Sequence, residues 1–298
     1  MGLFFEVVLP VLLVFLSGFA LQKWKKLNIQ SVSTAALYVF IPCLVFRTIY
    51  EKALDLQYLE VLIFALVLLF VLITIVKVTS KIKKYPQSTE SGLILSSAFM
   101  NSGNYGSPVV LFAFGQAGFA YAIMFFVLQA IIMNFFGVYY AARGKAGVKT
   151  ALRSVFEMPA TYALLVGLVV KAIDMPVPGN LFSIINLLAD AAIPAVMLVL
   201  GMQLAEISVR GFHWGKITYG TIVRLLVSPL IAWAITLVMP MDPLLEKVLI
   251  VLCAMPCAAT TTMFAVQFDS EPRMVSSITL VTTLVSVFTV TGVLVLVQ

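Results

Sequence analysis

The sequence contains few charged residues, one histidine and three cysteines. Asp, Glu, Lys and Arg make up 11% of its 298 residues, and 62% of the residues are apolar. An ordinary soluble domain has about 25% charged and about 45–50% apolar residues, so this composition excludes a water-soluble enzyme. Roughly ten helices of about 20 residues would occupy two-thirds of the chain. Length and composition therefore fit a helical membrane protein without a soluble domain.

The scarcity of metal-binding and nucleophilic side chains excludes further classes. The cysteines, Cys43, Cys253 and Cys257, lie in apolar runs, and an odd number in such runs is not a disulfide framework. No histidine lies near them to complete a metal site, so we expect no metal and no cofactor. The lone His213 lies in a polar connection, where it cannot serve an intramembrane serine protease. No glycine loop with Lys-Ser or Lys-Thr is present to bind ATP, and we predict that the protein is not an enzyme.

Ten apolar segments are long enough to cross a bilayer. A helix rises 1.5 Å per residue, the hydrocarbon core is about 30 Å thick, and backbone groups inside lipid must be paired within the segment. We therefore predict an all-α integral membrane protein with ten transmembrane helices. The predicted spans, numbered 1 to 10 in chain order, are 3–22, 31–50, 57–79, 90–113, 117–140, 156–174, 181–205, 217–239, 244–267 and 273–297.

Basic residues between the spans lie mainly on one side. Of the 19 Lys and Arg residues, 14 fall in connections on one side, four fall on the other side, and Arg224 lies within a span. The basic side is expected to face the cytoplasm, which places both termini on the extracellular or periplasmic side. The predicted location is the plasma (inner) membrane, with the lipid bilayer as partner and no nucleic acid.

The two halves of the sequence share an order of prolines and glycines. Pro10 and Gly18 recur 149 residues later as Pro159 and Gly167, and Ile41-Pro42 recurs 152 residues later as Ile193-Pro194. Spans 4 and 9 are both interrupted by polar residues and proline. Five spans per copy is an odd number, so the second copy must be inverted, as in many secondary transporters. We predict one transporter domain, 1–298, made of repeats 1–142 and 150–298.

The interruptions in spans 4 and 9 form the candidate site. Span 4 contains NSGNYGSP at 101–108, and span 9 contains MPCAATTT at 255–262. Glycine and proline break helices, and Ser107-Pro108 resembles the start of a second half-helix. Two half-helix N-termini, each with about half a positive charge, would converge at the midplane without a carboxylate beside them. This pattern predicts an anion site; the alternative is two kinked helices packed by small residues.

Polar side chains near these breaks are the candidate ligands. Asn101, Asn104 and Thr260–Thr262 supply donors and acceptors, although Thr261 and Thr262 also suit hydrogen bonding within their own helix. In span 5, Gln129 and Asn134 fit either interhelical hydrogen bonds or the substrate cavity.

These strings resemble the auxin efflux carrier family. NSGNYGSP is similar to the family's Asn-x-Gly-Asn-x-Gly-x-Pro motif, and AMPCAATTTMFAVQF followed by TLVTTLVSVFTV is similar to its C-terminal segment. The match runs from about Pro10 to Val290, and this sequence lacks the long cytoplasmic loop of the plant hormone carriers. The resemblance implies a sodium/proton antiporter-like fold with helices 4 and 9 crossed, within the superfamily of bile-acid, arsenite and riboflavin transporters. It also implies permeases for malate, malonate and related organic anions. The crossing and substrate positions that it implies are Asn101, Gly103, Asn104, Gly106, Pro108 and Pro256.

Two ionisable residues lie within spans. Asp190 in span 7 and Arg224 in span 8 have similar predicted depths, and each would be costly if unpaired in lipid. They fit a coupling or gating pair, a static structural pair, or an Arg224 that extends to the membrane surface while Asp190 faces a cavity.

The sequence as a whole predicts a secondary transporter that moves a small organic anion, such as a mono- or dicarboxylate, by alternating access. Spans 4 and 9, with 3, 5, 8 and 10, would form the moving core; spans 1, 2, 6 and 7 would form a scaffold and a candidate homodimer face. The alternatives are a membrane sensor that binds a small anion without moving it, a channel, and a sodium-coupled symporter of the bile-acid type.

Overall fold

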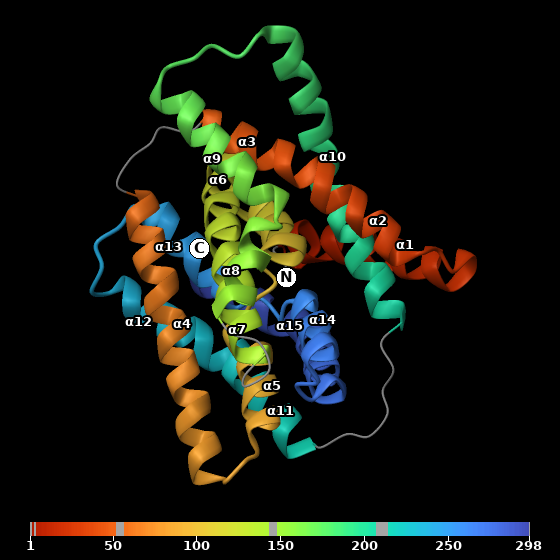
Figure 1. The fold of residues 1–298 in the computed structure, drawn as a ribbon, viewed down its shortest axis with the longest axis vertical. Coiled ribbons are helices and arrows are strands. Elements are labelled where there is room, and N and C mark those ends of the chain that lie inside the picture. The colour runs from red at the N-terminus through yellow and green to blue at the C-terminus, as the bar shows by residue number, and fades with distance from the viewer. Residues whose placement is uncertain (1, 3, 52–56, 143–147, 207–213, 298) are drawn as a thin grey trace.

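The structure is a computed structural model that describes residues 2, 4–51, 57–142, 148–206 and 214–297, and it is built from helices (Figure 1). Lys52, Arg143, Lys145, Arg210 and His213 lie outside the described residues. The α-helices are α1 (Leu9–Lys25), α2 (Ile29–Ala35), α3 (Ile41–Glu51), α4 (Gln57–Ile82), α5 (Gln87–Ala98), α6 (Ser107–Ile132), α7 (Val138–Ala141), α8 (Val148–Phe156), α9 (Pro159–Ala172), α10 (Gly179–Glu206), α11 (Trp214–Ile222), α12 (Ser228–Thr236), α13 (Pro243–Cys253), α14 (Ala259–Phe268) and α15 (Pro272–Val297). The π-helical turns are η1 (Phe4–Val8), η2 (Ala36–Phe40), η3 (Ser102–Gly106), η4 (Met133–Gly137) and η5 (Val223–Val227).

Seven continuous helical stretches of the described residues are long and apolar enough to cross a membrane. An eighth is added if α8 and α9, which meet at a 64° bend, are counted as one broken span. The seven stretches are Phe4–Lys25, Ile29–Glu51, Gln57–Ile82, Ser102–Ala141, Gly179–Glu206, Trp214–Thr236 and Pro272–Val297. The chain is therefore an all-helical, multi-pass membrane protein.

Predicted and observed helix boundaries agree where the helix is continuous. Six predicted spans match one helical stretch each, with every end within three residues. Predicted spans 90–113 and 244–267 are each divided by a non-helical break, as the sequence indicated. Predicted span 6, 156–174, agrees with α9 within three residues at each end, and α8 precedes it across the bend.

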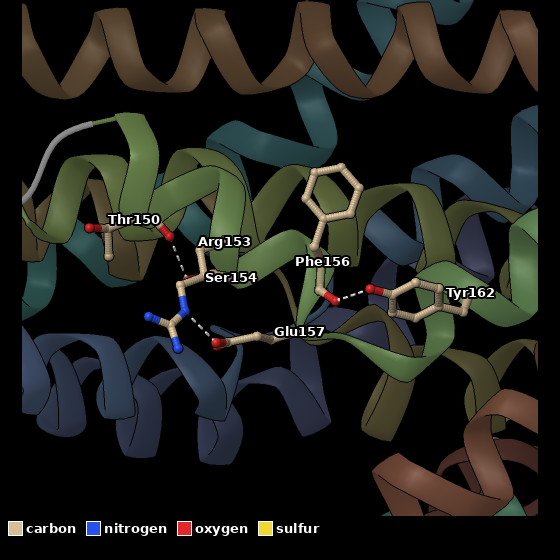
Figure 2. A network of polar contacts seen from close by, with 6 residues as sticks. All are labelled: Thr150, Arg153, Ser154, Phe156, Glu157 and Tyr162. Carbon is tan, nitrogen blue, oxygen red and sulfur yellow. Dashed lines mark hydrogen bonds and ion pairs between the residues drawn. The ribbon is translucent and has the colours of Figure 1, made fainter.

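The bend between α8 and α9 is stabilised by polar contacts (Figure 2). The Tyr162 hydroxyl donates to the Phe156 carbonyl oxygen at 2.7 Å, and thus satisfies one acceptor that the interrupted helix leaves free. Arg153 and Glu157 form an exposed ion pair at 2.7 Å, one turn apart. Pro159 begins α9 and cannot donate a helical hydrogen bond, so the sequence itself fixes the position of the bend.

Gly115 divides the longest helical stretch. The 40 residues of Ser102–Ala141 would extend about 60 Å as a straight helix, twice the thickness of the hydrocarbon core. Gly115 has φ 65° and ψ −162°, a backbone conformation that disfavours residues with a Cβ. The helical stretch is therefore kinked at Gly115 and does not run straight.

Helices α1 and α10 pack with their backbones in contact. A Cβ on Gly18 would lie 2.3 Å from the Leu198 carbonyl oxygen, and a Cβ on Gly201 would lie 2.0 Å from the Phe15 carbonyl oxygen. Small residues permit this close approach, which is how membrane helices associate without a hydrophobic driving force.

Two hydrophobic clusters organise the interior. The smaller one joins α3 and α10 to the part of α6 that follows Gly115, through residues such as Leu44, Val196 and Ile123. The larger one surrounds the breaks near residues 100 and 255 and includes side chains of α4, α5, α6, α13 and α15. This larger cluster positions the candidate site.

Candidate functional site

The two interrupted segments meet as a short antiparallel pair. Non-helical residues Phe99–Asn101 follow α5, and non-helical residues 254–258 follow α13. The Asn101 N–H donates to the Pro256 carbonyl oxygen at 2.8 Å, and the Ala258 N–H donates to the Phe99 carbonyl oxygen at 3.1 Å. These bonds flank a bridge between Met100 and Cys257. Breaks from opposite halves of the sequence thus satisfy each other's backbone groups, as a membrane interior requires.

Asn101 begins the second half-helix of the first break. Its side-chain oxygen accepts from the Asn104 N–H at 3.2 Å and caps η3, which starts at Ser102. The prediction of a start near Ser107 is therefore wrong by about one turn. The Ser107 hydroxyl donates to the Ser102 carbonyl oxygen at 3.0 Å from within the helix, because Asn101 already provides the cap.

The two glycines of this half-helix allow close packing. A Cβ on Gly103 would come within 2.5 Å of the Phe126 ring, and a Cβ on Gly106 within 2.7 Å of the Leu252 side chain. Pro108 is buried and lies just after the π-helical turn η3, so it lies inside the half-helix that Asn101 caps.

The second break leads into α14, which begins at Ala259 without a side-chain cap from the described residues. Thr261 is fully buried, and its hydroxyl donates to the Ala258 carbonyl oxygen at 2.7 Å and lies 3.2 Å from the Cys257 sulfur. Thr260 and Thr262 are half-buried. The Thr261 hydroxyl is thus engaged within its own turn, and the Thr261 N–H also donates to the Ala258 carbonyl oxygen, at 3.1 Å.

Arg224 contacts the C-terminal ends of α5 and α13, the half-helices that precede the two breaks. Its guanidinium is fully buried and donates to the Ser97 carbonyl oxygen at 2.8 Å and to the Cys253 carbonyl oxygen at 2.7 Å. It also contacts the Ser228 hydroxyl, which itself donates to Cys253 at 3.0 Å. Helix C-termini carry partial negative charge and are stabilised by cations, so Arg224 neutralises both ends.

The charges around the breaks do not cancel. Two helix C-termini contribute roughly one negative unit and two N-termini roughly one positive unit; Arg224 adds one more positive charge. Residues 91–115 and 248–268 contain no charged side chain. The arrangement therefore has an excess of roughly one positive charge, which an anion can compensate.

Comparison with known proteins identifies the family of the chain. Residues 3–155 and 145–294 match the model of the membrane transport protein family. The chain belongs to this family. The resemblance to auxin efflux carriers is thereby confirmed, and the protein is a membrane transporter rather than an enzyme.

Relatives cover almost the whole transporter. An uncharacterized transporter of Methanocaldococcus jannaschii is 27% identical over 297 residues, which cover 96% of each chain. An uncharacterized transporter of Methanothermobacter thermautotrophicus is 28% identical over 289 residues, which cover 94% of each chain. A Rhizobium meliloti protein named provisionally as a malonate transporter is 24% identical over 279 residues, which cover 90% of this chain and 86% of the relative.

The other predicted polar residues differ in their relation to the breaks. The half-buried Asn104 side chain has no hydrogen-bond partner among the described residues. Gln129 accepts from the Ser102 hydroxyl at 3.0 Å, while its buried amide nitrogen has no partner there. Asn134 instead donates to the Ala130 carbonyl oxygen of its own helix at 2.9 Å. Asn104 and Gln129 are thus placed at the first break, and Asn134 is not.

The predicted pair between Asp190 and Arg224 is not formed. Asp190 accepts from Arg47 of α3 at 2.6 Å, and Arg224 binds the carbonyl oxygens described above. Similar depth did not make the two residues neighbours, because α10 packs on α1 and α3 rather than on the helix that carries Arg224. Arg47 was missed because it was counted as a charge of a connection. Its place inside the apolar run 36–49 was the signal that could have identified it.

Proposed function

We propose that this transporter carries a small organic anion, such as the mono- or dicarboxylates of the malonate class, through the crossing of the two breaks. The observation that carries the proposal is the uncompensated positive charge there. Arg224 neutralises the helix C-termini, while the segments 91–115 and 248–268, which contain the N-termini of η3 and α14, hold no acidic residue. The name of the Rhizobium meliloti relative supports malonate as the first substrate to test.

In the proposed site, the backbone donors of the two half-helix N-termini hold a carboxylate. The side chains of Asn101, Asn104, Thr260 and Thr262, together with Gln129, supply directional contacts. The hydrogen bond from the Asn104 N–H to the Asn101 side-chain oxygen holds the carboxamide of Asn101 at the helix start, so the side-chain amide of Asn104 is the main side-chain donor. Thr261 serves the local structure, because its hydroxyl is already bonded.

We infer ten spans arranged as two inverted five-helix repeats, 1–142 and 150–298. Span 1 packs on span 7 as α1 on α10, and span 2 packs on span 6 as α3 on α9. In an inverted repeat, span 1 corresponds to span 6, span 2 to span 7 and span 4 to span 9. When corresponding spans are exchanged, the contact between spans 1 and 7 becomes the contact between spans 6 and 2, and the contact between the breaks of spans 4 and 9 is unchanged. This pattern of contacts supports the sodium/proton antiporter-like arrangement.

The proposed orientation places the basic side in the cytoplasm of a plasma membrane and both termini outside. Contacts between helix ends support the two predicted sides. Gln22 at the end of α1 donates to Glu206 at the end of α10 at 2.6 Å, on the proposed inner side. Lys171 at the end of α9 donates to the Tyr50 carbonyl oxygen at 2.7 Å, on the proposed outer side.

Counterflow of labelled malonate into proteoliposomes tests the function. Asn104→Asp places a negative charge at the N-termini of the half-helices and is expected to abolish counterflow. Asn104→Ala removes one polar contact and should weaken malonate binding by about 1–3 kcal/mol. Asn28→Asp is the matched control, because Asn28 is an exposed N-cap and aspartate caps equally well. If Asn104→Asp carries malonate as well as the wild type does, the anion site is elsewhere.

A further inference from the structure

A second polar site lies away from the crossing. A cavity of about 720 Å³ is bounded by α3, α10, the start of the α6 segment that follows Gly115, and the beginning of α13. This volume is within the range of about 300–1,000 Å³ typical of small-molecule sites. Its described lining contains no residue of the two breaks, so the cavity is distinct from the anion site proposed above.

The cavity lies at the proposed outer face. Its lining includes the last turn of α3, the residue that caps the start of α13, and Gln116 directly after the turn at Gly115. All of these positions are at the ends of spans on the side opposite the main basic clusters. The cavity also separates α3 and α10, which belong to the proposed scaffold, from α13, which belongs to the proposed core.

The cavity is lined by one arginine, Arg47, and by three carboxylates, and Arg47 forms an ion pair with one of these, Asp190. Arg47 Nη1 and Asp190 Oδ1 are 2.6 Å apart; the Arg47 side chain is 18% exposed and the Asp190 side chain is 72% exposed. Asp190 engages only one donor of a guanidinium that can bind a carboxylate with two parallel hydrogen bonds. One turn away, the buried side-chain oxygen of Asn186 has no partner among the described residues. Among the described residues, the cavity thus presents guanidinium donors of Arg47 and an acceptor of Asn186 without partners.

The remaining acidic residues of the cavity do not occupy Arg47. The Asp242 carboxylate accepts from the N–H groups of Leu244 and Leu245 at 2.9 and 3.1 Å and caps α13. Within the described part of the chain, Glu51 forms no ion pair with Arg47, and it is exposed at the end of α3. Asp190 is therefore the carboxylate against which an incoming anion must compete.

We propose that this cavity is an outer access site, in which a carboxylate of the substrate replaces Asp190 on Arg47. The inference rests on the proposed transport of organic anions and adds a second binding step to it. Asp190 keeps the guanidinium of Arg47 paired while the cavity is empty. Because Asp190 competes with the substrate for Arg47, the affinity of the cavity for the substrate is low. Low affinity suits an access site, because the bound substrate must leave it to reach the crossing.

The two members of the ion pair then have opposite effects on capture, which a purely structural pair would not have. Asp190→Asn frees Arg47 from its competitor and is expected to lower the KM for malonate by about two- to five-fold, the range that corresponds to an exposed ion pair. Arg47→Gln removes the binding group and should raise KM at least tenfold. Because the crossing is unchanged, kcat should stay within about twofold in both variants.

The measurement is the initial rate of labelled malonate counterflow in right-side-out membrane vesicles, with transporter content and thermal unfolding checked for every variant. Arg47→Lys keeps the charge but loses the two-pronged geometry, so its KM should lie between those of wild type and Arg47→Gln. The control pair, Arg153→Gln and Glu157→Gln, removes another exposed ion pair that lies outside both sites and should leave KM unchanged.

Changes of KM in the same direction for Arg47→Gln and Asp190→Asn, or no change in either, overturn the outer site. A lower KM for Arg47→Gln with a higher KM for Asp190→Asn would show that the cavity attracts cations, and it overturns the proposal as well. Asn104→Asp separates these outcomes from failure at the crossing, because its loss of transport depends on the crossing alone. If neither malonate nor a panel of other mono- and dicarboxylates is carried, the proposed function and the access site both fail.

Discussion

Arg224 is the residue whose replacement tests the crossing most directly. Arg224→Met keeps the length of the side chain and removes its charge and its donors. The Ser97 and Cys253 carbonyl oxygens then lose charged hydrogen bonds, which contribute roughly 1.5–3 kcal/mol each. Ser228 still donates to Cys253, so Ser97 is the acceptor left without its donor.

Removal of a buried charge offsets part of this loss, because keeping an ion out of water is unfavourable by several kcal/mol. Among the described residues no carboxylate forms an ion pair with Arg224, so the substitution leaves no acid unpaired. We expect a net loss of about 3 kcal/mol in the free energy of unfolding. At about 2–4 °C per kcal/mol for a chain of this size, the melting temperature should fall by about 6–12 °C.

The assay is thermal unfolding of the purified transporter in detergent, followed by tryptophan fluorescence. Arg224→Ala supplies a second measurement, since its truncated side chain leaves space for free guanidinium. Millimolar guanidinium should raise the melting temperature of Arg224→Ala, and urea, which has a similar shape without charge, should not. Arg153→Met is the control for loss of an exposed arginine. Equal melting temperatures for wild type and Arg224→Met, with no response of Arg224→Ala to guanidinium, would refute the role of Arg224 at the helix ends.

Two further predictions concern packing and orientation. Gly201→Ala places a Cβ 2.0 Å from the Phe15 carbonyl oxygen, so α1 and α10 must separate, and we expect a loss of about 1–3 kcal/mol in thermal unfolding. Gly179→Ala, with no atom within 4 Å of the new Cβ, should unfold like the wild type; equal losses in the two variants would contradict the backbone contact. In a variant without the native cysteines, Gly179→Cys should react with an impermeant thiol reagent in intact cells, and Lys83→Cys should be protected. The reverse labelling pattern would invert the proposed topology.

The positions of the breaks were predictable because their causes are local. Asparagine, glycine and proline disfavour a continuous helix where they cluster in an apolar run, and the breaks at 99–101 and 254–258 lie at the starts of the strings identified at 101–108 and 255–262. The exact start of the second half-helix was not predictable from a cap motif alone. Asn101 and Ser107 are both good N-caps by residue type, and the pairing of Asn101 with Pro256 decides between them.

The partners of charged residues could not be predicted from the sequence, for a different reason. Depth in the membrane can be read from the residue number, but the direction in which a side chain points depends on helix rotation and on which helices are neighbours. Asp190 and Arg224 have similar predicted depths, yet Asp190 pairs with Arg47 of α3, and Arg224 binds the helix ends at the crossing. Backbone carbonyl oxygens at helix ends do not depend on residue type, so the sequence could not indicate which groups Arg224 binds.

The backbone pairing between the two breaks also dictates an order of assembly. The Phe99 carbonyl and the Asn101 N–H depend on Ala258 and Pro256, which the ribosome adds only after most of the chain has been made. Until then, a first half already in the bilayer holds backbone groups without partners, and each such group is unfavourable by several kcal/mol in hydrocarbon. The first break must therefore stay in contact with water or with the insertion machinery while the second half is synthesised. The paired breaks are therefore the last part of the protein to reach their final environment, and neither half of the chain can form this pairing alone.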